Sequence, residues 1–377
     1  MTNSESILFQ VPNQVGLGHM NRMGSVALAL RKLAPAVRSI FVVEGSTHGF
    51  LESFAVPYIT FPKAGRLYNS PHWQSWQPAE KEFLLENMAT SILSAFQPTL
   101  VVFDCIPSFH IARAAITNGI RCALCIRLVH DFQKYASDPR VQLLLASEAL
   151  LIVPHREAEF RLPNSLMSRA VYVGQIVRPV GQDRTCPHAS SSKAIRRIVI
   201  TGGGGGGATT AEYFNLALDA CAHAKQRIPE IRVLLITGPL FVRWHKLNMP
   251  SGIKIIPFDP NFQSTCFGAD LVISQAGYNT VNELLVAGVP AICIPAMRPF
   301  DDQFQRARSA AANSANIHCF EGNNVEDLTK LVTLCLSGAT ARPHLDDPDG
   351  ASRAAECILN EIGNDKPTES MTDALFS

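Results

Sequence analysis

The sequence lacks the features by which membrane, secreted and nucleic-acid-binding proteins are usually recognised. Its 377 residues contain no stretch approaching about 18 uninterrupted apolar residues, and no basic segment followed by an apolar run opens the chain. The formal net charge is only +1, which gives no electrostatic argument for nucleic acid or an anionic membrane. We therefore expect a cytoplasmic protein without a transmembrane segment, in which any bound anion is held by local groups.

Signatures of metal sites and disulfides are also scarce. The ten cysteines are scattered singly, often inside apolar runs where cysteine acts as a small hydrophobic residue. The one close pair, Cys122 and Cys125, lies in an expected strand, which argues against a redox or zinc site. No Asp-x-Asp motif directly follows an expected strand. We therefore expect no tightly bound divalent ion.

What the chain does have is a regular alternation of strand-like and helix-like segments. Hydrophobic residues make up 47% of the sequence and charged residues 17%, as in well-packed globular proteins. The alternation is typical of α/β proteins with parallel sheets. Expected strands cover residues 7–11, 39–43, 58–61, 100–103, 122–126 and 149–153, and then 197–201, 232–237, 253–257, 271–274, 291–295 and 317–320. Expected helices include 23–33, 79–96, 325–336 and 352–362.

The length of the chain exceeds what one hydrophobic core usually holds, so two domains are expected. A stretch rich in proline and serine interrupts the alternation near its middle. We expect a Rossmann-like N-terminal domain over 1–176, a linker over 177–194, a second Rossmann-like domain over 195–350, and a C-terminal helix and tail over 351–377. Ligands bind outside the carboxyl ends of parallel strands, so the two domains are expected to face one another across an interdomain cleft.

The first glycine-rich turn, Gly16-Leu17-Gly18, leads directly to His19. Glycines permit close backbone approach, and the start of the following helix presents the imidazole at the ligand edge. An imidazole is mostly neutral at physiological pH and suits a general base. A surface loop histidine is the equally weighted alternative. The turn lacks the third glycine of a dinucleotide fingerprint, so NAD binding is poorly supported.

Asp104 ends the expected strand over 100–103. A carboxylate at the carboxyl end of a strand can orient an imidazole and stabilise its protonated form. It can equally cap the helix that follows. Spacing alone does not separate these two interpretations.

Six consecutive glycines, residues 202–207, join the next domain's first strand to a helix expected to start near Thr209. Such a run lets several backbone amides approach an anion at the positive end of the helix dipole. It lacks the Lys-Ser/Thr ending of a nucleoside triphosphatase loop. We therefore predict phosphate binding here, in preference to a flexible spacer.

A polar block from residue 274 to 308 follows the strand over 271–274. An acid, Glu283, is expected in the first turn of a helix and could accept hydrogen bonds from a ribose diol. The segment Thr280 to Glu283 also fits a capping box, in which the acid would only satisfy a backbone amide. Asp302 and Gln303 open a second helix, either as sugar ligands or as ordinary first-turn residues.

These motifs, with residues 173–178 and Gly288-x-Pro290, resemble the GT-B glycosyltransferases of the MurG type. The resemblance spans nearly the whole chain in the right order, and the block over 274–303 is its most specific part. It implies an inverting transferase whose co-substrate is a nucleotide-sugar, usually UDP-linked, with UDP-N-acetylglucosamine the first expectation for the donor. It also implies that the donor binds mostly to the C-terminal domain and the acceptor to the N-terminal one, with no other cofactor.

The resemblance also assigns roles to individual residues. His19 would deprotonate the acceptor, and Glu283 would hold the ribose diol. Our own expectation from its position is that Asp104 orients the His19 imidazole. Asp302 and Gln303 would hold the donor sugar, Arg178 would reach the diphosphate, and Phe258 would lie against the base. The remaining expected donor-binding residues are Gly18, Gly204, Gly205, Gly206, Ser274, Gly277, Tyr278, Asn279 and Thr280.

Two departures from MurG keep rival functions open. Arg22 replaces a proline of the first loop, and the second loop is all glycine where MurG has Ser-Gln. The Gly-His-x-x-Arg form also occurs in nucleotide-sugar hydrolases of the same architecture, so hydrolysis is the first alternative. A non-catalytic nucleotide-sugar-binding subunit is the second.

The acceptor is expected to meet the segment over 65–96. Its aromatic residues offer flat faces to a small molecule such as a natural product or aminocyclitol, and a membrane surface is the alternative contact. Expected acceptor-binding residues are Tyr68, Trp73, Trp76 and Arg127. For the oligomeric state, a monomer and a homodimer are the two expectations.

Overall fold

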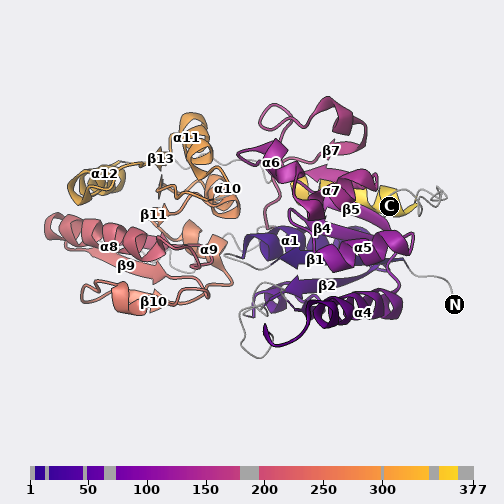
Figure 1. Cartoon of the computed structure of the whole chain (residues 1–377). Coiled ribbons are helices and arrows are strands. Elements are labelled where there is room, and N and C mark those ends of the chain that lie inside the picture. The colour runs from indigo at the N-terminus through magenta and orange to yellow at the C-terminus, as the bar shows by residue number, and fades with distance from the viewer. Residues whose placement is uncertain are drawn as a thin grey trace. The chain divides into compact units, whose positions relative to one another are not determined.

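The computed structural model describes residues 5–12, 17–45, 49–62, 74–178, 195–298, 301–338 and 348–363. The chain folds into two compact units (Figure 1). The first unit contains His19–Ile176 with the strand before it and the helix at the end of the chain, and the second contains Val177–Pro348 with Val15–Gly18. In the described parts of the chain, none of the helices is both long and apolar enough to cross a membrane.

The first unit is built on a seven-stranded parallel sheet in the order β3-β2-β1-β4-β5-β6-β7. Its central strands are runs of apolar residues buried on both faces, as expected where helices cover a parallel sheet. The strands are β1 (Ser6–Pro12), β2 (Arg38–Glu44), β3 (Tyr58–Phe61), β4 (Leu100–Asp104), β5 (Arg121–Cys125), β6 (Leu150–Val153) and β7 (Ala170–Tyr172). The short β7 was not expected from the sequence.

Helices cover this sheet and position its ligand edge. The helix α1 (Gly18–Leu33) begins five residues earlier than expected, so that His19 is its second residue. The helix α4 (Pro78–Phe96) begins at a capping box between Gln77 and Glu80, with a proline in its first turn. The other helices of the first unit are α5 (Phe109–Thr117), α6 (Phe132–Ala136), α7 (Pro139–Ala146) and α13 (Gly350–Gly363), with short 3-10 turns at Leu51–Phe54 and Asn164–Arg169.

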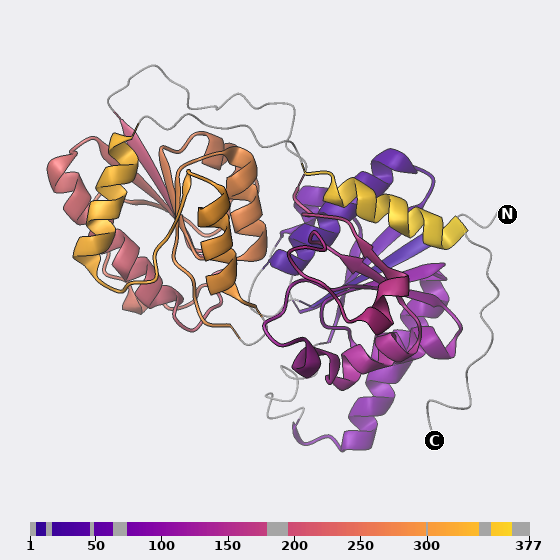
Figure 2. The same ribbon diagram turned by 90° about the horizontal axis from the view of Figure 1, so that it is seen from above.

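The last helix, α13, belongs to the first unit, although the second unit precedes it in sequence (Figure 2). Arg121 at the start of β5 donates a hydrogen bond to the Ile362 carbonyl at 3.0 Å. At the other end of the helix, a Cβ added to Gly350 would lie 2.2 Å from the carbonyl oxygen of Gln175, so backbone packs directly on backbone there. The chain therefore returns to the first unit beside the point where it left.

The second unit repeats the plan with six parallel strands in the order β10-β9-β8-β11-β12-β13. They are β8 (Arg196–Thr201), β9 (Ile231–Ile236), β10 (Lys254–Ile256), β11 (Leu271–Ser274), β12 (Ala291–Cys293) and β13 (Ile317–Cys319). The helices are α8 (Thr210–Arg227), α9 (Phe262–Phe267), α10 (Tyr278–Ala287), α11 (Gln303–Asn313) and α12 (Val325–Ser337), with a 3-10 turn at Trp244–Lys246. Helices α8 and α12 pack together over one apolar layer of the sheet (Figure 1).

Strand order places four of the candidate motifs at topological switch points. In the first sheet the order reverses between β1 and β4, whose carboxyl ends lead to His19 and to Asp104. In the second it reverses between β8 and β11, which lead to the glycine run and to the turn before α10. Such points are where open parallel sheets bind ligands. Each unit therefore presents its own candidate half-site.

Candidate active site

The structure brings His19 and Asp104 together, although 85 residues separate them in sequence. His19 Nδ1 lies 2.8 Å from Asp104 Oδ2. The carboxylate is completely buried, whereas 22% of the imidazole is exposed. An ionised carboxylate accepts only, so the neutral imidazole carries its proton on Nδ1 and keeps the lone pair on Nε2. This is the tautomer that a general base requires.

A third residue, Arg22, completes this group and received no role from the sequence. Its Nε donates to Asp104 Oδ1 at 3.0 Å, and its Nη2 donates to Oδ2 at 2.6 Å. Arg22 lies three residues after His19 on α1, a spacing that places both side chains on one face of a helix. That spacing was the available signal, but the partner on β4 could not be read from it.

The backbone after Asp104 makes an unusual turn. Cys105 has a φ of 61°, and the Ile106 amide donates to the Asp104 carbonyl at 2.8 Å across only three residues. Such tight turns with positive φ are rare and strained for a residue with a Cβ. The Cys105 amide donates to the Cys125 carbonyl, and the Tyr135 hydroxyl donates to the Cys105 carbonyl. These contacts hold the turn, and Asp104 is therefore not the cap of the next helix, whose N-cap is Ser108.

The charges in this group shift the pKa values of His19 and Asp104 in opposite directions. Burial lowers the pKa of His19, but the charge of Asp104 and its hydrogen bond raise it, and the net pKa lies above the ordinary 6.5. Burial raises the pKa of the Asp104 carboxyl, but the charges of Arg22 and His19 lower it, and the net pKa is well below its usual range. Asp104 is therefore ionised wherever the protein is folded at ordinary pH.

The glycine run of the second unit serves close packing as well as any ligand. A Cβ added to Gly205 would lie 2.3 Å from the Thr237 carbonyl oxygen, and one added to Gly202 would lie 2.7 Å from the Phe214 ring. Gly203 has a φ of 61°, which favours glycine whatever surrounds it. Only part of the run is therefore explained by a need to approach an anion. Gly206 is exposed and Gly204 half-buried, at the positive end of α8.

Two polar groups that the sequence did not single out lie beside the last glycine of this run. A Cβ added to Gly207 would come within 2.5 Å of Arg298 Nη2 and 2.8 Å of Thr210 Oγ1. Thr210 is completely buried, and within the described parts of the chain its hydroxyl has no hydrogen-bond partner. Arg298 Nη2 donates to Gln275 Oε1 at 3.1 Å, which links the glycine loop to the turn before α10.

The turn before α10 corrects one expectation. Helix α10 begins at Tyr278 with Gly277 as its N-cap, so Thr280 lies inside the helix and cannot cap it. Glu283 is the sixth residue of α10, in its second turn and not its first. Both the first-turn acid and the capping box are therefore wrong, because the backbone turns at glycine before the threonine. Glu283 is buried, with 7% exposed, and attracts Arg178 electrostatically.

Four other expected donor-binding residues lie at the start of a helix or at the end of a strand. Gly18 and Asn279 lie in the first turns of α1 and α10. The Tyr278 ring lies under the Arg306 guanidinium, at 5.8 Å from the ring centroid. The Ser274 hydroxyl is completely buried and faces Cys293 Sγ at 4.0 Å, so its side chain is not presented at the turn.

The residues expected to hold the donor sugar are engaged with their own backbone. Asp302 is the N-cap of α11 and accepts from the Gln305 amide at 2.9 Å. Gln303 is buried, and its Oε1 accepts from the Ala296 amide at 3.0 Å. The nearby Asp301 pairs with Arg306, which also donates to the Ala276 carbonyl. This network fixes the loop after β12, and a role of Asp302 or Gln303 toward a sugar stays a prediction.

Arg178 and Phe258 lie in the same unit. Arg178 Nη1 donates to the Pro260 carbonyl at 3.0 Å, and the Arg178 carbonyl accepts from Gln263 Nε2 at 2.8 Å. Phe258 is half-buried in the segment after β10. The predicted base-binding segment is therefore tied to Arg178 by two hydrogen bonds.

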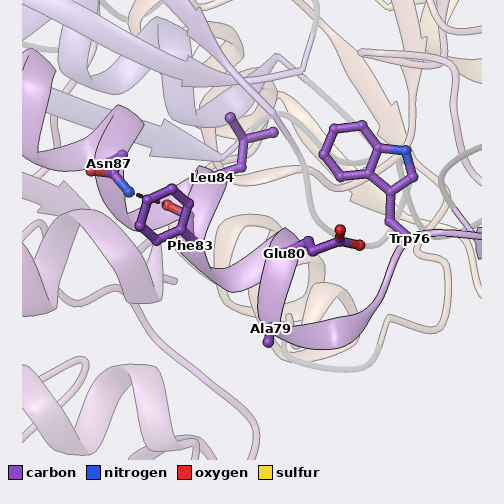
Figure 3. Close-up of a pocket in the computed structure, with 6 residues that line it drawn as sticks. All are labelled: Trp76, Ala79, Glu80, Phe83, Leu84 and Asn87. Carbon is purple, nitrogen blue, oxygen red and sulfur yellow. Dashed lines mark hydrogen bonds between the residues drawn. The ribbon is translucent and has the colours of Figure 1, made fainter.

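Among the expected acceptor residues, Tyr68 and Trp73 lie outside the described residues, as do residues 179–194 of the expected linker. Trp76 lines a hollow of about 470 Å³ at the start of α4, with 37% of the residue exposed. Phe83, 71% exposed, and Leu84 turn apolar surface into the same hollow (Figure 3). Arg127 follows β5 and lies near enough to Cys105 for its charge to act on that thiol.

Comparison with known proteins places this geometry in a class. Residues 197–354 match the glycosyltransferase family 28 C-terminal domain. A relative from Leuconostoc citreum, named UDP-N-acetylglucosamine--N-acetylmuramyl-(pentapeptide) pyrophosphoryl-undecaprenol N-acetylglucosamine transferase, is 28% identical over 41% of this chain and 46% of its own length. The enzyme of the same name from Ectopseudomonas mendocina is 34% identical over 29% of this chain and 33% of its own. The chain thus aligns with less than half the length of these relatives.

Solved structures match over almost the full chain at low identity. The spinosyn rhamnosyltransferase SpnG is 16% identical with a TM-score of 0.59, covering 95% of this chain and 96% of its own. The UDP-GlcNAc 2-epimerase from Neisseria meningitidis is 12% identical with a TM-score of 0.61, covering 95% and 99%. Such identities establish the fold alone.

The two parallel sheets and these matches define a GT-B fold built from two Rossmann-like units, as the sequence predicted. Residues 197–354 match the glycosyltransferase family 28 C-terminal domain, and the chain resembles the MurG-type glycosyltransferases, as its motifs predicted.

Proposed function

We propose that this protein is an inverting glycosyltransferase that moves a sugar from a UDP-sugar, with UDP-N-acetylglucosamine the first candidate, to a hydroxyl or amine of a small-molecule acceptor. The observation that carries the proposal is the 2.8 Å contact between His19 Nδ1 and Asp104 Oδ2, at the switch point of the first sheet. It occurs in a chain whose residues 197–354 match the glycosyltransferase family 28 C-terminal domain.

In the proposed reaction the acceptor oxygen or nitrogen attacks the anomeric carbon on the face opposite the phosphate. The bond from that carbon to the phosphate oxygen breaks, and its electron pair leaves with UDP. The acceptor proton passes to His19 Nε2, and Asp104 stabilises the resulting imidazolium. Inversion follows because one displacement occurs. The reaction requires the donor half-site of the second unit and the base of the first at the same time.

The leaving diphosphate gains negative charge, and the second unit offers groups of the right sign for it. Gly207 lies just before α8, and the Arg298 guanidinium and the buried Thr210 hydroxyl both lie close to the point where it would carry a Cβ. Helix N-termini and fixed cations stabilise such charge without reorganisation. We propose that these groups act without a metal ion and that the UDP-sugar is the only co-substrate.

The cluster that could offer ligands to a metal supports this reading. Among the described residues, one group of three such side chains has its ligand atoms close together: His19, Asp104 and Cys105. Both Asp104 oxygens already accept from Arg22, and Cys105 Sγ accepts from the same guanidinium at 3.3 Å. A dication there would have to displace a buried cation. Turnover measured with and without EDTA tests the proposal, and we expect no change.

For the acceptor, we propose a small molecule with an apolar or ring face that packs on Trp76 and Phe83. The hollow at the start of α4 has a volume in the range of small-molecule sites. Helix α4 follows a parallel strand, so its first turn lies at the ligand edge of the sheet. Acceptor libraries of aromatic natural products and aminocyclitols, offered with UDP-N-acetylglucosamine, test this class by mass spectrometry.

The experiment that tests the base is His19→Gln, assayed for sugar release or transfer from UDP-N-acetylglucosamine. Loss of a general base should lower kcat by about 10²- to 10⁴-fold while the Kd for UDP changes little. His110→Gln is the matched control, because His110 Nε2 also contacts a carboxylate, Glu82, at 2.8 Å in the same unit. Unchanged turnover in His19→Gln would remove the assignment.

Hydrolysis is the second candidate, and Arg22 is the residue that favours it, because it completes the Gly-His-x-x-Arg form. Water would then replace the acceptor, with the same base. Incubation with UDP-N-acetylglucosamine alone separates the two functions: rapid release of free sugar supports a hydrolase, whereas a slow rate that an acceptor accelerates supports transfer. UDP binding with no sugar consumed in either case would indicate a non-catalytic subunit.

A further inference from the structure

We propose that Arg22 is a positioning residue for the general base: its guanidinium holds both oxygens of Asp104 and thereby limits how tightly that carboxylate retains a proton on His19. The inference rests on the proposed function only for its catalytic consequence. Its physical content, a coupling between Arg22 and His19 through one carboxylate, is a property of the folded first unit.

Arg22 and His19 both contact the same oxygen of the Asp104 carboxylate. Asp104 Oδ2 accepts from Arg22 Nη2 at 2.6 Å and from His19 Nδ1 at 2.8 Å. Oδ1 accepts from Arg22 Nε at 3.0 Å, which completes a two-pronged contact that only arginine can make. Arg22 is 2% exposed and Asp104 is fully buried, so water does not screen these charges.

Arg22 also acts on the imidazole directly. Its Nη2 lies 3.5 Å from His19 Nδ1, the atom that carries the proton in both the neutral and the charged ring. When His19 takes up a second proton, two positive charges face one another across a single carboxylate. Their repulsion opposes the attraction of Asp104. A histidine paired with a carboxylate alone would hold its proton more firmly.

The other groups around His19 do not replace this effect. Cys105, from the turn after β4, faces Asp104 Oδ1 at 3.6 Å and accepts from Arg22. Cys125, from β5, adds a buried thiol whose pKa burial raises well above its usual value. Arg127, after β5, acts on Cys105. Among these described neighbours, Arg22 is the cation that contacts both His19 and Asp104.

In the proposed reaction, the effect of Arg22 on His19 supports turnover. A general base works best when its conjugate acid loses the proton near the operating pH. An imidazole held too strongly by Asp104 would stay protonated and could not accept the acceptor proton. By sharing the carboxylate, Arg22 keeps the dyad oriented while it weakens the hold on the proton.

The test follows the titration of His19 by NMR in the full chain labelled with ¹³C-histidine. The His19 signal is assigned by its loss in His19→Gln. In Arg22→Met we expect the His19 midpoint to rise by about one pH unit or more. In Arg22→Lys, whose ammonium cannot span both oxygens, we expect a smaller rise. The acidic limb of kcat/KM for UDP-N-acetylglucosamine should move to higher pH by the same amount.

Arg113→Met is the control, because Arg113 pairs with Glu86 on α4, and its loss should leave the His19 midpoint in place. Removal of one partner of a buried ion pair can prevent folding. The thermal melting of each variant is therefore measured as well. If Arg22→Met does not fold, the His19 midpoint in Arg22→Lys, which keeps the buried charge, tests the proposal. A folded variant with an unchanged His19 midpoint overturns the proposal, even if its turnover falls. A shifted midpoint in a protein that consumes no sugar supports the coupling and removes the proposed function.

Discussion

Arg298 Nη2 donates a hydrogen bond to Gln275 Oε1 at 3.1 Å, and the same nitrogen lies 2.5 Å from the point where Gly207 would carry a Cβ. One cation thus touches both turns at the switch point of the second sheet. Arg243 secures the glycine side, since its Nη1 donates to the Gly207 and Ala208 carbonyls at 2.8 Å. A diphosphate at this point would meet a guanidinium that is already fixed in place.

We therefore expect Arg298→Gln to weaken UDP binding about tenfold, by about 1.4 kcal/mol, with little change in Tm. Isothermal titration with UDP and with uridine measures the effect. Only UDP should lose affinity, because uridine carries no diphosphate. Arg308→Gln is the control, because Arg308 is an exposed arginine of the same unit and pairs with Glu321. Equal losses for UDP and uridine would argue that Arg298 only supports the loop.

Glu283→Gln separates a ribose contact from a structural role. Glu283 does not belong to a capping box, so the substitution removes no cap from α10. We expect UDP affinity to fall about tenfold, because a carboxylate that accepts from a diol binds more strongly than an amide. The loss should vanish with 2′,3′-dideoxy-UDP, which has no diol.

The matched control for this prediction is Glu326→Gln, an exposed acid at the start of α12. A ribose role is contradicted if dideoxy-UDP loses as much affinity as UDP does.

Asp104→Asn should destabilise the first unit by about 3 kcal/mol, because it leaves the Arg22 charge buried without a counter-charge. Urea unfolding measures the difference. Asp138→Asn is the control: Asp138 pairs with Arg140 near the surface and caps α7, and asparagine keeps the cap, so less than about 1 kcal/mol should be lost. Similar losses for both variants would mean that burial of Asp104 has no special cost.

The raised pKa of His19 predicts two pH effects with definite signs. Activity needs the neutral imidazole, so kcat/KM should rise with pH through a limb above 6.5. Stability runs the other way: a pKa raised by folding stabilises the protein below the unfolded pKa, and the contribution is lost as pH rises through the folded pKa. The difference in unfolding free energy between wild type and His19→Gln should be larger at about pH 5.5 than at about pH 9. A limb below 6.5 would contradict the predicted shift.

Much of the fold was predictable because parallel strands carry a strong local signal. Buried on both faces, they appear as short apolar runs, and β1, β4, β8 and β11 were all placed within about one residue. The positions of His19 and of the glycine run then followed from the rule that ligands bind at carboxyl ends. The three-residue β7 escaped because so short a run resembles a loop.

The site was less predictable because its contacts join distant segments. Arg22 and Asp104 are 82 residues apart, and only their meeting in space reveals the shared carboxylate. The start of α10 was misplaced because a capping box can be written wherever threonine precedes glutamate by three, whereas the backbone turned at Gly277. The sequence predicted a phosphate-binding role for the glycine run but not its packing role, because the contact of Gly205 with Thr237 joins segments that are distant in sequence.

The contact of Gly350 with Gln175 has a consequence for how this chain can be shortened. Its last helix, α13, completes the fold of the first unit, so truncation before residue 350 damages the unit that carries His19 and spares the second unit. Truncated variants designed by position in sequence would therefore assign a loss of function to the wrong unit. Conversely, joining residue 176 to residue 349 through a short spacer would excise the second unit from a first unit that keeps all of its strands.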